Sequence, residues 1–500
     1  MRILIIALLL LATASVHAQS LDREAALADI ELAREVLSEL HAGYDRYSSS
    51  EALAGRWDAL EEAASEGLDR DRFFVELSGI LAAIACDHTK AEFPQQQVDA
   101  RESAPVYLPF RFRLFGEPGT WRMLVEHSGV DGLGRGDEIL SIDGDPVSER
   151  IDAIWPLMPV DGRTTHVRRQ VLASSSEFLG SGFDHFDPLI NTINDRVELE
   201  VMAPDGVTRE LAPNRIGYAE FRQLGSDGAR YRNFSDPDAV ELTIRDDGQA
   251  TLSISTFVNY RTPVDPGTVF DPFFEELKAK QVQRLIVDMR QNGGGSVDAQ
   301  IALVQRLIKR PVQPVSEIRV RSIQPQQFRE HLSTWEQSAL NPDPAWFIAD
   351  GDEWILRPEI SGAGTVIEPH PLAFAGELIV LIGPANSSGA TTMIGAVAEA
   401  GDAVLVGEPT GGNQAGSTAG ILYYLTLPNS GVRIRVPAQR TVTGFQQVED
   451  GEGYAPDLAA PLTLEAWRAE RACLSAQGVE AQETSSRRPR QACSLFVRNR

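Results

Sequence analysis

Two adjacent serines stand at a turn between an apolar run and a small-residue helix. The segment that begins at Leu378 reads LIVLIGPANSSGATTMIGAVAEA. The first turn of a helix carries peptide N–H groups without intrahelical acceptors, and these can stabilise an oxyanion in front of a hydroxyl. A serine in such a turn is ordinarily a helix cap, but Gly389 permits the close approach of a substrate backbone. We therefore predict Ser388 as a nucleophile and Ser387 as the cap or a neighbour.

A second glycine-rich turn precedes the serine turn by about ninety residues. The segment that begins at Arg284 reads RLIVDMRQNGGGSVDAQIALVQRLI and has the same layout of strand, turn and helix. Two such turns can face one another across a cleft and direct N–H groups at one carbonyl. Asp288, Arg290 and Asn292 are expected to brace this turn rather than to react.

A serine nucleophile needs a base that accepts its proton. No lysine follows Lys309, and Asn413 stands 25 residues beyond Ser388, where a lysine base would be expected. The base is therefore a histidine or a carboxylate. Of the eight histidines, His88 lies at a helix-to-loop junction in the segment CDHT, where a structural C-cap is also common. The others are His17 in the N-terminal apolar segment and six in polar or loop contexts without a signature: His41, His127, His166, His185, His331 and His370.

The patterning divides the chain into three parts. Residues 20–92 carry apolar residues at three- and four-residue spacing, which predicts a helical unit. From Pro105, short segments of alternating polarity predict a small strand-rich module, interrupted by a helical insertion at 152–193. From about Ala239, strands and helices alternate, which favours an α/β core with largely parallel strands.

The composition excludes some classes of protein. The chain has 500 residues, of which 43% are hydrophobic, and is long enough for several domains with a large core. Its formal net charge of -25 argues against a nucleic-acid partner, because phosphate binding relies on a basic surface. An acidic soluble surface explains this charge without a specific partner.

The first 18 residues are typical of a secretory signal peptide. Arg2 is followed by the apolar run 3–12 and by Val-His-Ala at 16–18, a small-x-small cleavage site. The run is shorter than the roughly 20 apolar residues that span a bilayer, although an uncleaved N-terminal anchor is the alternative. We expect a periplasmic or secreted protein that contacts the membrane only through the signal peptide before its cleavage.

The three cysteines do not have the spacing of a metal site. Cys473 and Cys493 lie twenty residues apart in a polar tail and either form a disulfide or stay free. Cys86 lies in an apolar helical pattern and is expected to be a small core residue. The sequence therefore predicts no bound metal and no cofactor.

Several motifs together resemble those of a known protease family. The segments VDMRQNGGG, PANSSGATT with VGEPTGG, and CDHT are similar to signature blocks of the C-terminal processing and tricorn-type serine proteases. The segment GLGRGDEILSIDGDPV resembles part of a PDZ domain, which these proteases commonly carry. The resemblance spans about 77–458. It implies an α/β core of the ClpP/crotonase-like spiral type, an N-terminal helical domain and a PDZ-like β-rich domain.

The resemblance also implies roles for individual residues. The nucleophile of the family falls on Ser388, and its oxyanion donors fall on the backbone of Gly389 and Gly294. Its dyad lysine falls on Asn413, which excludes the dyad of the processing proteases. The tricorn-like branch instead pairs the serine with a histidine from an N-terminal block, and His88 matches that position.

A supporting carboxylate is implied shortly before a Pro-Asp pair. In the segment VEDGEGYAPD, the spacing to Pro456 favours Asp450, with Glu449 and Glu452 as alternatives. A solvated acidic loop without a catalytic role explains this stretch equally well.

These observations predict an exported serine endopeptidase that hydrolyses peptides or unfolded proteins through a Ser-His acyl-enzyme mechanism. The alternatives are a non-catalytic protein that binds peptides or lipids on the same fold, and a PDZ scaffold. Substrate preference and oligomeric state stay open. The expected domains are a signal peptide (1–18), an N-terminal helical domain (19–103), a PDZ-like domain with a helical insertion (104–215), a protease core (216–465) and a tail (466–500).

Overall fold

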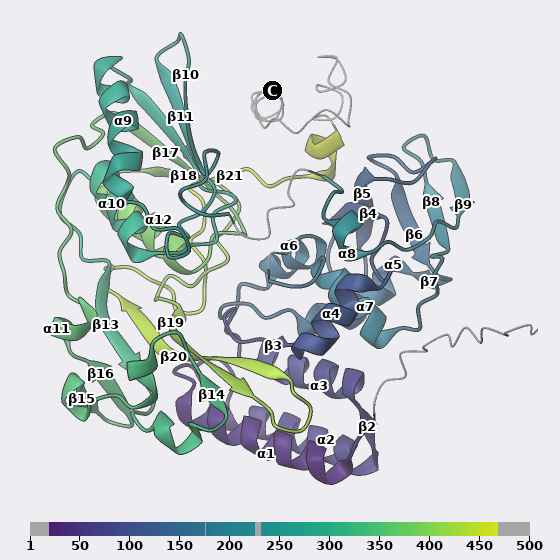
Figure 1. Ribbon diagram of the computed structural model, residues 1–500. Helices are drawn as coiled ribbons and strands as arrows, with labels where there is room; N and C mark the ends of the chain where they lie inside the picture. Colours follow the sequence, from purple (N-terminus) through teal and green to yellow (C-terminus); the bar gives the residue numbers. More distant parts are fainter. Residues whose placement is uncertain (1–19, 176, 226–231, 469–500) are drawn as a thin grey trace, which may run out of the picture.

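The computed structural model describes residues 20–175, 177–225 and 232–468. The predicted signal peptide and the cysteine pair Cys473 and Cys493 lie outside these ranges. Within them, no helix combines the length and the apolar character that a membrane span requires. Figure 1 shows a lobe built around strands β10 to β21 and a second lobe around β4 to β9, with the N-terminal helices beneath both.

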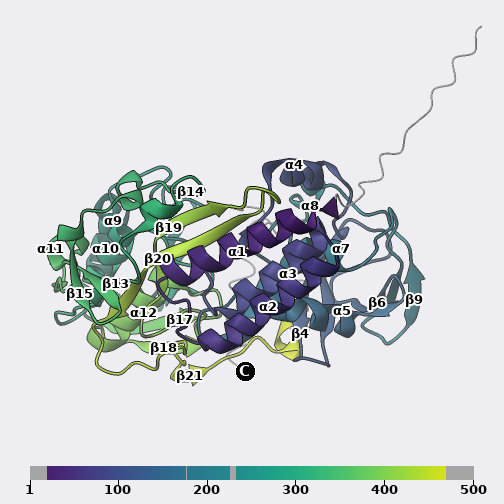
Figure 2. The same cartoon turned by 90° about the horizontal axis from the view of Figure 1, so that it is seen from below.

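The N-terminal helices connect the two lobes. Asp22, Ser49 and Asp69 cap the first three helices, each through a side chain that accepts a backbone N–H. These helices cross the underside of the molecule (Figure 2), and their buried side chains share one continuous apolar cluster with β4–β9 and with β19 and β20. The elements are β1 (Ser20–Leu21), α1 (Arg23–Leu40), α2 (Ser50–Glu66), β2 (Leu68–Asp69), α3 (Arg70–Ala83) and α4 (Gln95–Ser103).

The strand-rich lobe is an antiparallel sheet in the order β4-β5-β6-β8-β9, with β7 beside β6. Three of its helices, α5, α6 and α7, lie between β7 and β8 in the sequence, where the sequence predicts an insertion. The strands are β4 (Phe110–Phe115), β5 (Arg122–Ser128), β6 (Glu138–Ile142), β7 (Asp145–Pro146), β8 (Leu199–Met202) and β9 (Thr208–Leu211). The helices are α5 (Val147–Ile154), α6 (Arg168–Ala173), α7 (Gly182–Ile190) and, after β9, α8 (Tyr218–Phe221).

The core lobe contains a six-stranded sheet in the order β10-β11-β12-β17-β18-β21. All pairs after β10-β11 are parallel, as the alternating sequence pattern predicts. Helices α9, α10 and α12 bury Phe270, Leu303 and Ile394 in one apolar cluster with these strands. The elements are β10 (Val240–Ile244), β11 (Gln249–Ile254), α9 (Pro266–Ala279), β12 (Arg284–Asp288), α10 (Val297–Leu307), β17 (Glu377–Ile382), α12 (Ser388–Ala400), β18 (Val404–Gly407) and β21 (Leu458–Ala459).

A second, antiparallel sheet completes the core in the order β14-β19-β20-β13-β16-β15. The short strand β3 (Ala91–Glu92) pairs with β20, so that Ala91 lies opposite Ile434. This pairing attaches the segment after His88 to a strand more than three hundred residues later. The other elements are β13 (Val315–Val320), β14 (Leu332–Ser333), β15 (Phe347–Asp350), β16 (Glu353–Leu356), α11 (Pro358–Ser361), β19 (Thr418–Thr426) and β20 (Arg433–Thr443).

Candidate active site

The predicted nucleophile begins a helix in a strained backbone conformation. Strand β17 ends at Ile382, and α12 begins at Ser388. Ser388 has φ +49°, in the left-handed region that residues other than glycine seldom occupy. Ser387 is at the N-cap position, but its side chain does not cap the helix. Strain of this kind is typical of functional sites, where the surrounding structure holds a side chain in place.

Asn386 fixes the serine turn to the glycine turn. Its side chain is fully buried, and its Nδ2 donates hydrogen bonds to the carbonyl oxygens of Met289 (2.5 Å) and Asn292 (3.0 Å). Its Oδ1 accepts the N–H of Gly383 at 2.8 Å. The role of Asn386 was not predicted from the sequence, in which it is a lone polar residue before the serine pair.

The two turns pack directly against each other. A Cβ atom on Gly294, which has φ +107°, would lie 3.0 Å from the nitrogen of Gly389 and 3.1 Å from Cβ of Ser388. A Cβ atom on Gly389 would lie 1.9 Å from Nε2 of Gln300, which donates to the carbonyl of Gly295 at 2.9 Å. The positive φ of Gly294 favours glycine there, whereas a side chain at 389 would displace the end of Gln300.

The predicted oxyanion donors differ in their hydrogen bonding. Gly389 lies in the first turn of α12, where an N–H has no intrahelical acceptor. The N–H of Gly294 donates to Oδ1 of Asn292 at 2.8 Å. The predicted donor Gly294 therefore has an acceptor within its own turn, whereas its role toward a substrate stays a prediction.

His88 lies in the segment that follows α3, and it lines the same cleft as Ser388. The helix ends at Ala83, and Ala85 adopts φ +60°, which turns the chain away from the helix axis. The N–H of Thr89 donates to the carbonyl of Cys86 at 3.1 Å, and β3 follows. His88 and Ser388 both line one cleft of about 2220 Å³, together with the glycine turn and Gly389.

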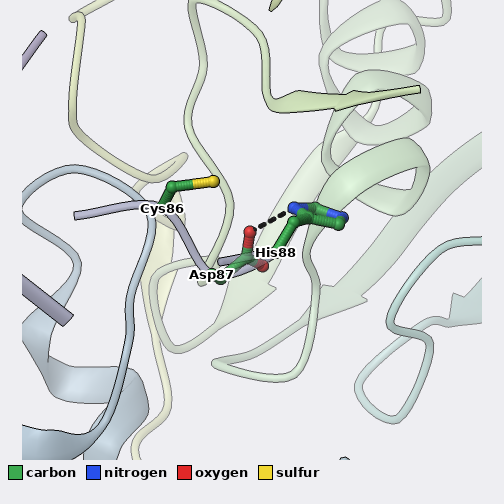
Figure 3. Close-up of side chains that lie close together, drawn as sticks. All are labelled: Cys86, Asp87 and His88. Atoms are coloured by element: carbon green, nitrogen blue, oxygen red, sulfur yellow. Dashed lines mark ion pairs between the residues drawn. The ribbon is translucent and has the colours of Figure 1, made fainter. Parts of the chain in front are cut away.

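Asp87 connects the histidine with the serine turn. Its Oδ1 forms an ion pair with Nδ1 of His88 at 2.5 Å, shown in Figure 3. Its Oδ2 accepts a hydrogen bond from the hydroxyl of Ser387. In the sequence Asp87 was only part of the motif CDHT, without a predicted role. In the structure it is the carboxylate that contacts the predicted base.

Burial and charge act in opposite directions on this pair. Burial opposes the charged form of each group, but the mutual attraction outweighs it, lowering the pKa of Asp87 to about 2 and raising the pKa of His88 well above its usual value. The contact between the two groups therefore favours the carboxylate form of Asp87 and the imidazolium form of His88.

Asp450 lies in a neighbouring polar network. Its Oδ1 accepts hydrogen bonds from Arg46 (2.6 Å), Tyr47 (2.7 Å) and Asn413 (3.0 Å). In the described chain Asp87, and not Asp450, is the carboxylate that contacts His88. The supporting role of Asp450 stays a prediction. Asp450 instead stabilises Asn413, the residue at the position of the family lysine.

The two alternative acids lie in the same loop. Glu452 forms an ion pair with Arg163 at 2.7 Å, and the N–H of Glu449 donates to the side chain of Gln414 at 3.2 Å. Like those of Asp450, these contacts are with residues other than Asp87 and His88.

A loop from the helical insertion of the second lobe contacts the segment around His88, which we call the base segment. The N–H of Gly162 donates to the carbonyl of Ala85 at 2.9 Å, and the hydroxyl of Thr164 donates to Gly411 at 2.8 Å. Asp161 is buried, and its Oδ2 accepts the N–H of Asn413 at 3.2 Å. Burial, with a further contribution from the charge of Asp87, raises the pKa of Asp161 to about 7.

His41 lies behind the base segment and is fully buried. Its Nδ1 accepts the N–H of Gly43 at 3.1 Å, so Nε2 carries the proton toward Oγ1 of Thr89 at 2.6 Å. Burial lowers the pKa of His41 to about 3 and keeps it neutral. The sequence placed His41 in a polar or loop context, because its partners come from a segment 48 residues away.

Comparisons with known proteins show a family and a fold to which the chain is similar. Residues 249–460 match the profile of Peptidase family S41. Mature CPAF superposes with a TM-score of 0.59 at 16% identity, over 95% of this chain and 98% of that chain. CPAF complexed with lactacystin has a TM-score of 0.59 at 15% identity, over 96% and 99%. A CPAF point mutant has a TM-score of 0.61 at 16% identity, over 95% and 98%.

The likeness to CPAF shows a shared fold of mixed α/β content with several sheets. No curated protein matches the sequence. The matched segment contains both glycine turns and Ser388, and proteins of this family act on peptide or protein substrates. Residues 249–460 therefore match peptidase family S41, and this match identifies a serine-type peptidase, a hydrolase.

Proposed function

We propose that the protein is an exported serine endopeptidase in which Ser388 is the nucleophile and His88 is the base. One observation carries this proposal. Two segments three hundred residues apart bring Ser388 and His88 to the wall of a single cleft, and Asp87 contacts both His88 and the serine turn. Export and a periplasmic or secreted location rest on the first 18 residues alone.

The reaction is acyl transfer to water. His88, in its neutral form, takes the hydroxyl proton as Ser388 attacks the peptide carbonyl, and then gives the proton to the departing amine. Water attacks the acyl-enzyme by the same route, and the acid product leaves as Ser388 regains its proton. Asp87 holds the ring through Nδ1 and stabilises the imidazolium that forms in each half of the reaction.

The oxyanion is stabilised by the N–H of Gly389, with a second donor from Gly294. Because the Gly294 N–H already meets Asn292, it contributes through a three-centre hydrogen bond shared by the side chain and the substrate. A donor of this kind contributes on the order of 100-fold in rate.

The architecture around the site follows the family resemblance. We propose that the parallel sheet with α9, α10 and α12 is a spiral core of the ClpP/crotonase type, and that 104–215 form a PDZ-like domain with a helical insertion. Residues Phe112 and Leu114 of β4 line the cleft that contains Ser388, which suits a module that guides an extended peptide to the nucleophile.

Labelling with a fluorophosphonate probe tests the nucleophile. Wild-type protein is expected to react, and Ser388→Ala is expected not to react. Ser387→Ala is the matched control, because it removes the neighbouring hydroxyl and its hydrogen bond to Asp87 but keeps Ser388. Labelling that survives in Ser388→Ala and disappears in Ser387→Ala would move the nucleophile by one residue. No labelling of wild-type protein, with peptide binding retained, would instead indicate a non-catalytic binding protein.

A further inference from the structure

We propose that Cys86, Asp87 and His88 form a binding site for a zinc-type divalent ion, and that an ion bound there inhibits the peptidase. The inhibition rests on the proposed function, since it requires His88 to be the base. The binding itself does not depend on that assignment.

The donor set is the first argument. A thiol sulfur, a carboxylate oxygen and an imidazole nitrogen of these three residues all lie within 4.8 Å of one another. Figure 3 shows the three side chains around the Asp87–His88 contact. Zinc takes these ligands, with a water in the fourth position of an open site. Magnesium and calcium prefer oxygen ligands, so the thiol selects against them.

An unsatisfied carboxylate oxygen is the second argument. Oδ1 of Asp87 and Nδ1 of His88 pair with each other at 2.5 Å. Oδ1 of Asp161, a residue that is 1% exposed, is buried and lacks a hydrogen-bond partner in the described chain. Asp161 acts electrostatically on both members of the pair. A buried carboxylate beside the three ligands favours a cation.

The site is closed on one side and open on the other. Cys86 is 2% exposed and donates its S–H to the carbonyl of Thr418 at 3.3 Å. His88 lines the cleft, which provides the path for an ion. The three consecutive residues lie in a tight turn, which the N–H of Thr89 closes by donating to the carbonyl of Cys86 at 3.1 Å. The spacing rules for zinc sites do not describe such a turn.

Binding requires a small opening of the ion pair and releases protons. Nδ1 and Oδ1 are 2.5 Å apart, whereas two such ligands on a tetrahedral zinc ion are about 3.3 Å apart. The thiol and the imidazolium each give up one proton to solvent, and the ion takes their place. The net charge of the site is zero before and after binding. With its ring nitrogen bound to the metal and its orientation fixed there, His88 no longer accepts the Ser388 proton.

Direct metal binding is the first arm of the test. The mature Ser388→Ala chain, without an affinity tag and freed of metal with EDTA, is titrated with Zn²⁺ against a chromophoric chelator. We expect one ion per chain, and at least about tenfold weaker binding when Cys86→Ser is added. Co²⁺ should give a thiolate charge-transfer band that Cys86→Ser abolishes. Absence of binding, or equal affinity in both proteins, would overturn the proposal.

Inhibition is the second arm. In wild-type protein, Zn²⁺ should slow fluorophosphonate labelling, and EDTA should restore the rate, whereas Mg²⁺ should have no effect. For Cys86→Ser, the labelling rate is compared with the metal-free rate of the same variant. Half-inhibition of this variant should need a Zn²⁺ concentration at least about tenfold higher than in wild-type protein. Equal inhibition of both proteins would contradict a site that contains Cys86. Wild-type protein that never reacts, but binds Zn²⁺ through Cys86, would leave the metal site in place and disprove the proposed function.

Discussion

The site has a serine half, residues 378–400, and a histidine half, the segment around His88. Different kinds of contact hold these two halves in place. The serine turn follows from its own sequence, since an apolar strand, a turn and a small-residue helix follow one another within 378–400. The segment 86–92 has no such local pattern. It is held by β20, by the carbonyl of Thr418 and by the loop at Gly162, all distant in the chain. The proposed nucleophile is thus positioned by local structure, and the proposed base by tertiary contacts.

The comparison predicts that damage to either half has the same catalytic result. Ser388→Ala and His88→Ala should each lower kcat/KM for a peptide by on the order of 10⁴-fold or more, and the double variant should be no worse than the worse single variant. Peptide hydrolysis measured with matched thermal unfolding checks this. Losses that multiply would show that the two residues do not act as one unit.

Asp87→Asn should separate orientation from charge within the histidine half. The rate at the optimum should fall by on the order of 10²- to 10⁴-fold, because the amide no longer stabilises the imidazolium. The acid limb of kcat/KM should move to lower pH, because the carboxylate is what raises the pKa of His88 despite its burial. A pH–rate profile in EDTA measures both effects. An unchanged acid limb would assign it to another group.

The same pair links pH to stability. The raised pKa of His88 contributes stability that is complete below its unfolded pKa of 6.5 and is lost as pH rises through the higher folded value. The lowered pKa of Asp87 contributes stability above 3.8 that is lost as pH falls through about 2. Wild-type protein should therefore lose thermal stability above neutral pH more steeply than Asp87→Asn.

The sequence predicted more of the serine half than of the histidine half. Ser388, Gly389 and Gly294 follow from turn chemistry and from a family resemblance, and the structure brings them together. Asp87 could be named only as part of a motif. Its partner Ser387 lies 300 residues away, and no periodicity in either segment encodes that contact.

The remaining differences have the same cause. The contact of Asp161 with Asn413 joins residues 252 positions apart, and the contact of Asp450 with Arg46 joins residues 404 positions apart. Spacing to a Pro-Asp pair favoured Asp450 as the supporting carboxylate, and this stays a prediction. Local spacing contains no information about these contacts, which come from distant segments.

Gly162→Ala should disturb the histidine half while leaving the serine turn folded. A Cβ atom there would lie 2.4 Å from Cα of Gly451, and φ +64° disfavours a side chain. The loop must shift, which should remove its bond to Ala85 and destabilise the protein by about 1–3 kcal/mol. Thermal unfolding and peptide hydrolysis report the two effects. Gly217→Ala is the control, because its Cβ would meet no atom within 4 Å.

Ala85→Gly should have the smallest effect and tests the backbone strain next to His88. Ala85 and Ser388 both occupy the left-handed region, at φ +60° and φ +49°. Glycine relieves about 1–2 kcal/mol of strain but adds about 0.5–1 kcal/mol of unfolded-state entropy. The free energy of unfolding should therefore rise by up to about 1 kcal/mol, with activity within about twofold of wild type. A loss of stability would mean that the methyl group of Ala85 packs usefully against the base segment. At Ser388 the same relief is impossible, because glycine there removes the nucleophile; the strain of the serine half is bound to its function, whereas that of the histidine half is a property of the turn alone.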